Sequence, residues 1–360
     1  MAESMSGLAR SHRCTEVSNK LIGTEVTVMG WVQKRRNLGS LIFVDLRDRS
    51  GILQLVFDQE VLSEEDYNKA NSLRSEYVVA AVGTVEKRSA AINENLKTGD
   101  IEIKVHTLRI LSESETPPFP IDENQTVKDE LRLKYRYLDL RNKKVRDNMI
   151  FRSQVISFLR AKMTEMGFLE IQTPILCASS PEGARDYIVP SRKYKGKFYA
   201  LPQAPQQYKQ LLMVSGFDKY FQIAPCFRDE DARADRSPGE FYQLDFEMSF
   251  ATEADVFKVG EEVLTAAFEK FAPEGYSVTK APYPVISFKE AMLTYGTDKP
   301  DLRNPLKIID VTEFFQRCTF KPFHNKTVRA INVHAKLSKG QHEKMLKFAQ
   351  SIGMGGLGYL

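Results

Sequence analysis

Cysteine is scarce in this chain, and the few cysteines lie far apart. The 360 residues include four cysteines and no CxxC pair. Small secreted domains depend on closely spaced cysteines, so the sequence excludes a disulfide framework and indicates reduced thiols in a cytoplasmic protein. Only five histidines are present, without an HExxH pair, which argues against a structural zinc site.

Long apolar runs and a strong net charge are also absent. No stretch of the sequence approaches the roughly 18 apolar residues of a membrane helix. The first residues, MAESMSGLARSHRC, lack the apolar core of a secretory signal, so none is expected. The 51 basic and 47 acidic residues leave a net charge of +4. Any attraction to nucleic acid must therefore come from local patches.

The composition that remains is typical of a multidomain globular protein. Hydrophobic residues make up 42% of the chain and charged residues 27%, and 360 residues suffice for two or three domains. Between about 20 and 112, three strand-like runs, one helical segment and two more strand-like runs follow in quick succession. Five strands with a helix after the third predict an OB-fold barrel, a frequent carrier of single-stranded nucleic acid.

Cations, an aromatic ring and an amide fall on neighbouring strands of this predicted barrel. They are Lys34, Arg36, Phe43 and Gln54. Aromatic side chains stack on bases and cations follow phosphates, so this set is compatible with a nucleic-acid surface. The residues by themselves slightly favour the alternative, a small barrel with a solvated basic turn and Phe43 in its core.

The rest of the chain mixes helices and strands. A proline-containing linker occupies 114–144. Apolar residues at helical spacing predict an amphipathic helix over about 145–167. Another helix is expected to begin at about Pro205. Thr252 and Asp255 predict a capping box at the start of a third helix.

The segment from Lys219 to Phe250 is the most informative, because it predicts two strands joined by a charged loop. The second strand, Glu240–Phe250, alternates strictly, which reserves one face for packing. That packing face is expected to hold Tyr242, Leu244, Phe246, Met248 and Phe250. The opposite face carries a phenylalanine, an amide and two carboxylates instead of the usual solvent lysines or threonines. This pattern fits a binding site, but alternation is common and leaves open the alternative, an ordinary hairpin with a solvated turn.

The loop between these strands carries charges of both signs. They are Arg228, Asp229, Glu230, Asp231, Arg233, Asp235 and Arg236. The sequence FRDEDARADRSPGEFYQLDFEMSF resembles motif 2 of class II aminoacyl-tRNA synthetases. It is similar to motif 2 of the bacterial-type aspartyl-tRNA synthetases in particular. The segments RDYIVPS, LPQAPQQYKQ and YGTDKPDLR favour this family over its asparaginyl and lysyl relatives.

The resemblance implies a multidomain fold. An N-terminal all-β OB-fold barrel would precede an α+β class II catalytic domain, in which helices flank an antiparallel sheet, and the start of an α/β insertion domain. The implied bounds are an anticodon-binding domain over 1–113, a hinge over 114–144, a catalytic domain with motifs 1 and 2 over 145–305, and the insertion over 306–360.

The resemblance also implies an activity, aspartate–tRNA ligation. L-Aspartate and ATP would form aspartyl-adenylate, with Mg²⁺ bridging the phosphates, and the aspartyl group would pass to the 3′ end of tRNA(Asp). No metal ligand is expected within this chain, and motif 1 would form a homodimer. Arg228 would be catalytic and would also grip substrate and ATP. The other implied aspartate-binding residues are Glu182, Gln206, Lys209, Gln243 and Asp245. ATP would further contact Glu230 and Phe241.

In the barrel, the family resemblance assigns an anticodon site. Phe43 would stack on an anticodon base, and the remaining implied contacts are Lys34, Arg36, Leu38, Gln54 and Glu102. Leu38 resembles the residue of enzymes that charge only the aspartate tRNA.

The glycine-rich third motif of class II synthetases, with its ATP-binding arginine, is not found in this sequence. The chain is therefore expected to be the N-terminal portion of such an enzyme, impaired or inactive alone. The alternative is a non-catalytic tRNA-binding or regulatory relative, which would explain the missing motif but not the retained pocket residues.

Overall fold

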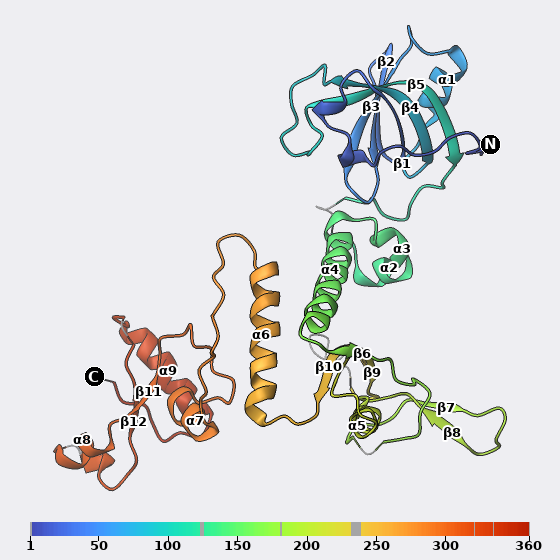
Figure 1. Cartoon of the computed structure of the whole chain (residues 1–360). Helices are drawn as coiled ribbons and strands as arrows, with labels where there is room; N and C mark the ends of the chain where they lie inside the picture. Colours follow the sequence, from blue (N-terminus) through green and yellow to red (C-terminus); the bar gives the residue numbers. More distant parts are fainter. Residues whose placement is uncertain are drawn as a thin grey trace. The chain divides into compact units, whose positions relative to one another are not determined.

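The structure, a computed structural model, forms two compact units, Met1–Phe250 and Ala251–Leu360. It describes residues 2–122, 126–180, 182–231, 239–319, 321–333 and 335–359. Within these ranges, no helix combines the length and the apolar character needed to cross a bilayer. Each unit is described by itself below (Figure 1).

The first unit begins with a closed five-stranded barrel. Its strands are ordered β1-β2-β3-β5-β4 around the barrel. The strands are β1 (Glu25–Asn37), β2 (Leu41–Arg47), β3 (Ile52–Asp58), β4 (Val78–Lys87) and β5 (Ile101–Ser112), and α1 (Glu64–Ser72) lies between β3 and β4. The short 3-10 helices η1 (Cys14–Glu16) and η2 (Asn19–Leu21) precede them. Five strands with a helix after the third confirm the predicted OB-fold.

The barrel core follows from strand alternation. Every second side chain of β2, at Ile42, Val44 and Leu46, is fully buried, while Phe43 between them is half-buried. The alternative that placed Phe43 in the core is therefore wrong, because the strand's period of two turns it to the outer surface. β4 and β5 approach closely at Gly83, where a Cβ would lie 2.3 Å from the carbonyl oxygen of Lys104, so this position requires glycine.

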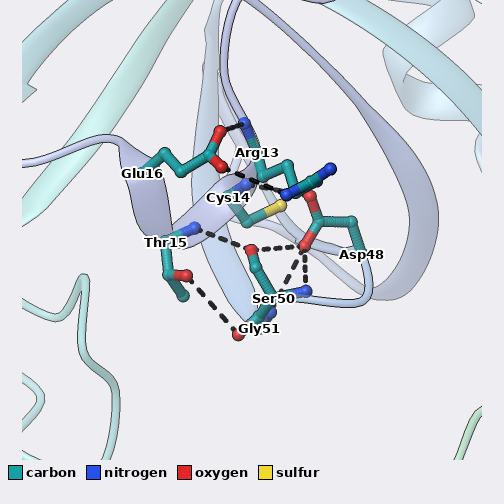
Figure 2. Close-up of polar contacts among 7 residues, drawn as sticks. All are labelled: Arg13, Cys14, Thr15, Glu16, Asp48, Ser50 and Gly51. Carbon is teal, nitrogen blue, oxygen red and sulfur yellow. Dashed lines mark hydrogen bonds and ion pairs between the residues drawn. The ribbon is translucent and has the colours of Figure 1, made fainter. Parts of the chain in front are cut away.

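A buried carboxylate fastens the N-terminal segment to the turn between β2 and β3 (Figure 2). Asp48 accepts hydrogen bonds from the backbone N–H of Cys14 at 3.0 Å and from the hydroxyl of Ser50 at 2.6 Å. Burial alone would raise the pKa of Asp48, but these hydrogen bonds and those of nearby backbone amides lower it below the ordinary value. The ionised form of Asp48 is thus the one that the fold requires.

A second buried charge joins the barrel to the helices that follow it. Glu76, 2% exposed and with a left-handed φ of 67°, accepts hydrogen bonds from Arg47 at 2.6 and 2.8 Å. Arg141 also donates to Glu76, at 2.6 Å, and its guanidinium lies 5.1 Å from the ring centre of Trp31. One carboxylate thus balances two arginines from different parts of the chain.

Helices and a small sheet complete the first unit. α2 (Asp129–Lys134), α3 (Arg136–Asp139) and α4 (Lys143–Glu165) lead into β6 (Leu169–Glu170). The hairpin of β7 (Ile188–Pro190) and β8 (Phe198–Ala200) follows, and then α5 (Gln206–Val214), β9 (Lys219–Phe227) and β10 (Glu240–Met248). The sheet order is β10-β9-β6, with β9 antiparallel to β10 and parallel to β6. The helices expected over 145–167 and from Pro205 are confirmed, with Asn142 and Pro205 as their N-caps.

The predicted packing face of the second strand is only partly correct. β10 ends at Met248, and Phe250 lies beyond it with a left-handed φ of 54° and 99% exposure. Tyr242 is 49% exposed, and its ring meets the guanidinium of Arg152 at 5.0 Å. The strand's period was correctly predicted, but its apolar side is only partly covered, because period two determines which way side chains point and not what covers them.

The second unit contains α6 (Glu253–Phe271), α7 (Phe288–Tyr295), β11 (Ile308–Asp310), α8 (Thr312–Arg317), η3 (Lys321–Phe323), β12 (Arg329–Ile331) and α9 (Lys339–Ser351). β11 and β12 pair as antiparallel strands. The predicted capping box at Thr252 and Asp255 is confirmed: both the backbone N–H and the hydroxyl of Thr252 donate to the Asp255 carboxylate, at 2.8 and 2.7 Å.

Replacing Asp48 by Asn should destabilise the barrel by about 1–3 kcal/mol at neutral pH, because the amide cannot accept from both Cys14 and Ser50 as a carboxylate does. Since the pKa of Asp48 is lowered by folding, its contribution is complete above about pH 4 and is lost as the pH falls through the folded value. Urea unfolding followed by the fluorescence of Trp31, the single tryptophan, reports on the barrel itself.

The matched control for this measurement is Asp298→Asn, since Asp298 is exposed and lies in the other unit. It should change the barrel's free energy of unfolding by less than about 0.5 kcal/mol. Equal stabilities of the Asp48 variant and the control at pH 7 would contradict the assigned role of the carboxylate.

Candidate functional site

The pairing of β9 with β10 creates a polar row on one face of the sheet. Residues directly opposite in an antiparallel pair share a face. Cys226 pairs with Phe241, Ala224 with Gln243, and Gln222 with Asp245. The register therefore brings together the predicted Phe241, Gln243 and Asp245 on one face. It adds Gln222, Cys226 and, opposite Glu247, Tyr220, which sequence reasoning missed.

A buried cation from α5 completes this row. The Lys209 amine donates to Asp245 at 2.9 Å and lies 3.3 Å from a Glu247 oxygen. The Lys209 and Asp245 side chains are only 13% and 11% exposed. Burial alone would lower the pKa of Lys209, but its hydrogen bond to Asp245 and the nearby negative charges raise it above the ordinary lysine value. The lysine is therefore a fixed positive charge on the polar face.

The acidic partner of this lysine is not fully used. Asp245 Oδ2 is buried and has no hydrogen-bond donor among the described residues. The negative charge of Asp245, together with burial, raises the pKa of Tyr220 above its ordinary range. A buried carboxylate oxygen with spare capacity can accept a donor from a ligand. Gln206, on the first turn of the same helix as Lys209, is half-buried.

Arg228 lies at the other end of the row, against an aromatic ring. Its guanidinium carbon is 5.0 Å from the ring centre of Phe241. Its backbone N–H donates to the carbonyl of Gly239 at 2.8 Å, which closes the end of the strand pair. Gly239 has a φ of 78°, and a Cβ there would meet the Tyr187 hydroxyl at 2.9 Å, so this position requires glycine.

The Cys226 thiol is buried on the polar face, and three residues implied by the family resemblance influence its pKa. Burial raises the pKa of Cys226 to about 11; Arg228 opposes this shift, whereas Asp245 and Glu182 add to it. The Cys226 thiol also donates to the Gln243 side-chain oxygen at 3.3 Å.

The loop that carries Glu182 is held in place by residues that sequence reasoning missed. Gln203, 1% exposed, accepts from the backbone N–H of Ala184 at 3.1 Å and donates to its carbonyl at 2.9 Å. Arg185 and Asp229 exchange two further hydrogen bonds, at 2.8 and 2.9 Å, which join this loop to the start of motif 2. These amide and backbone contacts leave no periodic signal in the sequence.

Other predicted residues are less constrained. Glu182 and Glu230 are exposed, and neither belongs to the strand pairing of β9 with β10. Three charged residues of the loop between β9 and β10 lie outside the described ranges. They are Arg233, Asp235 and Arg236.

On the barrel, three of the predicted anticodon residues, Arg36, Gln54 and Glu102, form one hydrogen-bonded network. Gln54 is its centre: it accepts from Arg36 at 3.1 Å and donates to Glu102 at 2.7 Å. The Arg36 guanidinium lies 5.9 Å from the ring centre of Phe43. Sequence reasoning missed two further members of the network. Asp45 accepts a hydrogen bond from Arg36 at 3.0 Å, and Arg88 donates one to Gln54 at 2.9 Å.

Two predicted barrel residues stand apart from this network. Lys34 and Leu38 are exposed, Leu38 by 71%. Buried nitrogens of Arg36 and Arg88 have no hydrogen-bond acceptor within the ranges described, so the network offers donors to a ligand. Asp45 lies directly opposite Gln54 in the pairing of β2 with β3, so this pairing could have identified Asp45 as a member of the network. Arg88 comes from a distant segment, and no pattern in the sequence links it to Gln54.

The described residues contain no group of three or more histidine, cysteine, aspartate or glutamate side chains able to hold a metal ion. The acids of the row are instead balanced by Lys209. This donor set does not fit a resident divalent cation, which prefers several oxygen ligands around one point.

Comparisons with known proteins identify the family of the chain. The family "tRNA synthetases class II (D, K and N)" matches residues 128–347, and an OB-fold nucleic acid binding domain matches residues 26–111. An asparaginyl-tRNA synthetase structure from Pyrococcus horikoshii, complexed with asparaginyl-adenylate, superimposes with a TM-score of 0.68 and 29% identity, over 79% of this chain and 66% of that one.

Curated relatives are more similar in sequence. An aspartate–tRNA ligase of Agathobacter rectalis is 55% identical, and an aspartate–tRNA(Asp/Asn) ligase of Lachnoclostridium phytofermentans is 53% identical. Both matches cover 100% of this chain and 61% of the relative. The chain thus spans about three fifths of the length of these relatives.

Replacing Lys209 by Met should lower the free energy of unfolding by about 1–3 kcal/mol, because it leaves the Asp245 carboxylate nearly buried without its cation. Since folding raises the pKa of Lys209, this contribution is complete below the ordinary lysine value of about 10.4 and is lost only as the pH rises through the folded value. The effect should therefore be constant between about pH 6 and 9.

Chemical unfolding followed by circular dichroism measures this loss. A double-mutant cycle with Asp245→Asn isolates the Lys209–Asp245 coupling. The control is Lys258→Met, because Lys258 is exposed on α6. A coupling energy of zero would show that the ion pair contributes nothing to stability.

Proposed function

Because the chain belongs to the class II tRNA synthetases of the aspartate, lysine and asparagine group, we propose that it carries the substrate-binding part of an aspartate–tRNA ligase. The observation that carries the proposal is the polar face of β9 and β10, on which a nearly buried lysine is held by two acids. Class II synthetases use ATP as a substrate, and the same face ends at Arg228 and Phe241.

The proposed substrate, L-aspartate, has one ammonium and two carboxylates, and the face offers matching charges. Lys209 would bind the β-carboxylate, exchanging part of its contact with Asp245 and Glu247 for the ligand. Asp245, with its unused buried oxygen, would bind the α-ammonium together with Gln206 and Glu182. A neutral amide in place of the β-carboxylate could not form an ion pair with the lysine, which disfavours asparagine.

Arg228 is suited to the phosphate of the proposed nucleotide substrate. A planar guanidinium grips an oxyanion with two parallel hydrogen bonds, so it would hold the α-phosphate and the reacting carboxylate in line. The carboxylate oxygen would attack the α-phosphorus, the bond to the bridging oxygen would break, and pyrophosphate would leave. Phe241 would stack on adenine, and Glu230 would contact its amino group or the tRNA end.

Magnesium enters this proposal only as a companion of ATP. The donor set of the described residues does not fit a resident ion. Mg²⁺ commonly binds substrate phosphates and keeps several waters, so the ATP phosphates would bring it to the site. The work of this chain's own residues is to align the carboxylate with the phosphorus and to balance charge.

The barrel is the proposed reader of the tRNA anticodon. Phe43 is half-buried on the outer face, beside the cation of Arg36, which suits stacking on a base. Gln54 and Glu102 present an amide and a carboxylate for base edges, and Lys34 would follow the phosphates. Exposed Leu38 at the end of β1 would help to restrict charging to tRNA(Asp).

Two further parts of the proposal concern assembly and compartment. A homodimer through motif 1 is supported by exposed apolar residues on α4, which are Met149, Ile150 and Phe151. The cytoplasm is the proposed compartment, which suits the four free thiols of the chain.

The wild-type chain should bind a non-hydrolysable aspartyl-adenylate analogue and reject the asparaginyl analogue. Lys209→Met should lower the ratio of the two affinities by about 30-fold, since about 2 kcal/mol of charge pairing is lost for only one ligand. Titration calorimetry measures both affinities on the same preparation, so any loss of folded protein cancels in the ratio. Lys258→Met again serves as the control.

Folded wild-type chain that binds neither adenylate analogue would contradict the proposed pocket. Retained binding of tRNA in that case would favour the non-catalytic, tRNA-binding alternative. An unchanged ratio in the Lys209 variant would remove this lysine from substrate selection while leaving the pocket in place.

In the barrel, Phe43→Ala should weaken binding of the tRNA(Asp) anticodon stem–loop by about 5- to 150-fold, because one stacked base is worth about 1–3 kcal/mol. Fluorescence anisotropy with labelled stem–loops of tRNA(Asp) and tRNA(Asn) measures both affinity and selectivity. Tyr137→Ala provides a matched control, since Tyr137 is an exposed aromatic residue on α3. Equal affinities of the Phe43 variant and the wild type would remove this ring from the proposed contact.

A further inference from the structure

The hairpin of β7 and β8 ends in a strongly basic tip. Residues 191–197 read SRKYKGK and include Arg192, Lys193, Lys195 and Lys197. No aspartate or glutamate occurs anywhere between Tyr187 and Phe217. None of the four cations forms an ion pair with a residue within the described ranges, whereas many other cations of the chain do so. The positive charge of the tip is thus not balanced by acids in the part of the chain that the structure describes.

Backbone hydrogen bonds give this tip a defined shape. Ser191 donates to the carbonyl of Lys197 at 2.9 Å, and Lys197 donates to that of Tyr194 at 3.2 Å. The backbone of Tyr194 also donates to the Ser191 hydroxyl at 3.2 Å. Every side chain from 192 to 199 is exposed, so the charges point into solvent from an ordered turn. Figure 1 shows the hairpin extending away from α5, β9 and β10.

An aromatic ring lies among the cations. Tyr194 is 50% exposed, and the amines of Lys193 and Lys197 are 5.5 and 5.7 Å from its ring centre. Phe198 and Tyr199 follow directly and are also exposed. Cations that follow a phosphate backbone, combined with rings on which bases stack, are the usual elements of single-stranded nucleic-acid binding. A purely electrostatic anion surface would not need the exposed aromatic rings.

The base of the hairpin is joined to the candidate site at both ends. Asp186, just before β7, contacts buried Gln203, which also holds the Glu182 loop. After β8, Ala200 pairs with Cys177, and the chain continues through Gln203 into α5 with Lys209. At about 3.3 Å per residue, the tip lies roughly 15–20 Å from this base. A polyanion bound at the tip could therefore place its end at the site.

We propose that the tip of the β7–β8 hairpin binds the acceptor arm of tRNA, with the lysines on its phosphates and Tyr194 stacked on an unpaired base. This inference rests on the proposed function, because only an RNA whose 3′ end must reach the site would need a contact at this distance. It adds to the anticodon contact on the barrel a second, independent RNA surface.

The test compares two triple variants that remove equal charge. Lys193, Lys195 and Lys197 are changed together to Ala, and the control changes Lys339, Lys344 and Lys347, which are exposed on α9 of the other unit. Fluorescence anisotropy measures the affinity of each full-length variant for an acceptor-arm minihelix and for an anticodon stem–loop, between 50 and 200 mM salt. Circular dichroism verifies that both variants are folded.

The hairpin variant should bind the minihelix at least about 5-fold more weakly than the wild type. The slope of log affinity against log salt concentration should be smaller in magnitude by about 2 to 3. Its affinity for the anticodon stem–loop should stay within about twofold of the wild type, as should both affinities of the control. Tyr194→Leu should weaken minihelix binding by about 5- to 30-fold with an unchanged salt slope.

Each contrary result has a distinct meaning. Wild-type binding of the minihelix with no change in the hairpin variant would overturn this inference and leave the proposed function intact. Equal losses in the hairpin variant and the control would show that only overall charge matters, which also overturns it. A wild-type chain that binds neither RNA would refute the proposed tRNA partner and this inference together.

Discussion

The antiparallel pairing of β9 with β10 is the constraint on which the candidate site depends. Its register runs without a bulge from the Lys219–Met248 pair to the Phe227–Glu240 pair. A slip of one residue would turn the carboxylate of Asp245 to the opposite face and away from Lys209. At the Phe227–Glu240 end of the pair, the backbone of Arg228 donates to the carbonyl of Gly239, which supports this register. A side chain at Gly239 would clash with the Tyr187 hydroxyl.

Polar side chains beside the β9–β10 pair and in the barrel are held by polar partners of the same chain. Lys209 is held by Asp245 and Glu247, and Gln54 is held by Arg36 and Glu102, so polar groups are pre-positioned by other polar groups. Such contacts limit the reorganisation needed when a charged ligand arrives. The β7–β8 tip differs, because its cations find no acid within the described ranges and remain available to a partner.

Buried carboxylates have a different role in the barrel. Asp48 fastens the N-terminal segment to a turn, and Glu76 joins two arginines, one from the barrel and one from the helices after it. Neither side chain reaches the proposed ligand surfaces. Their contribution is to hold the backbone on which the surface residues stand, so the barrel presents Phe43 and Gln54 in fixed positions.

The sequence by itself determined the local features, because these depend on neighbours along the chain. Period two predicted the strands and the polar row of β10, a capping box predicted the start of α6, and strand order predicted the barrel. Only the tertiary structure decided which distant residues meet the row, the barrel network and the Glu182 loop. They are Cys226 in the row, Asp45 and Arg88 in the network, and Gln203 at the loop. It also decided that Tyr242 stays partly exposed, since burial depends on what packs against a strand, and alternation along one strand carries no information about that.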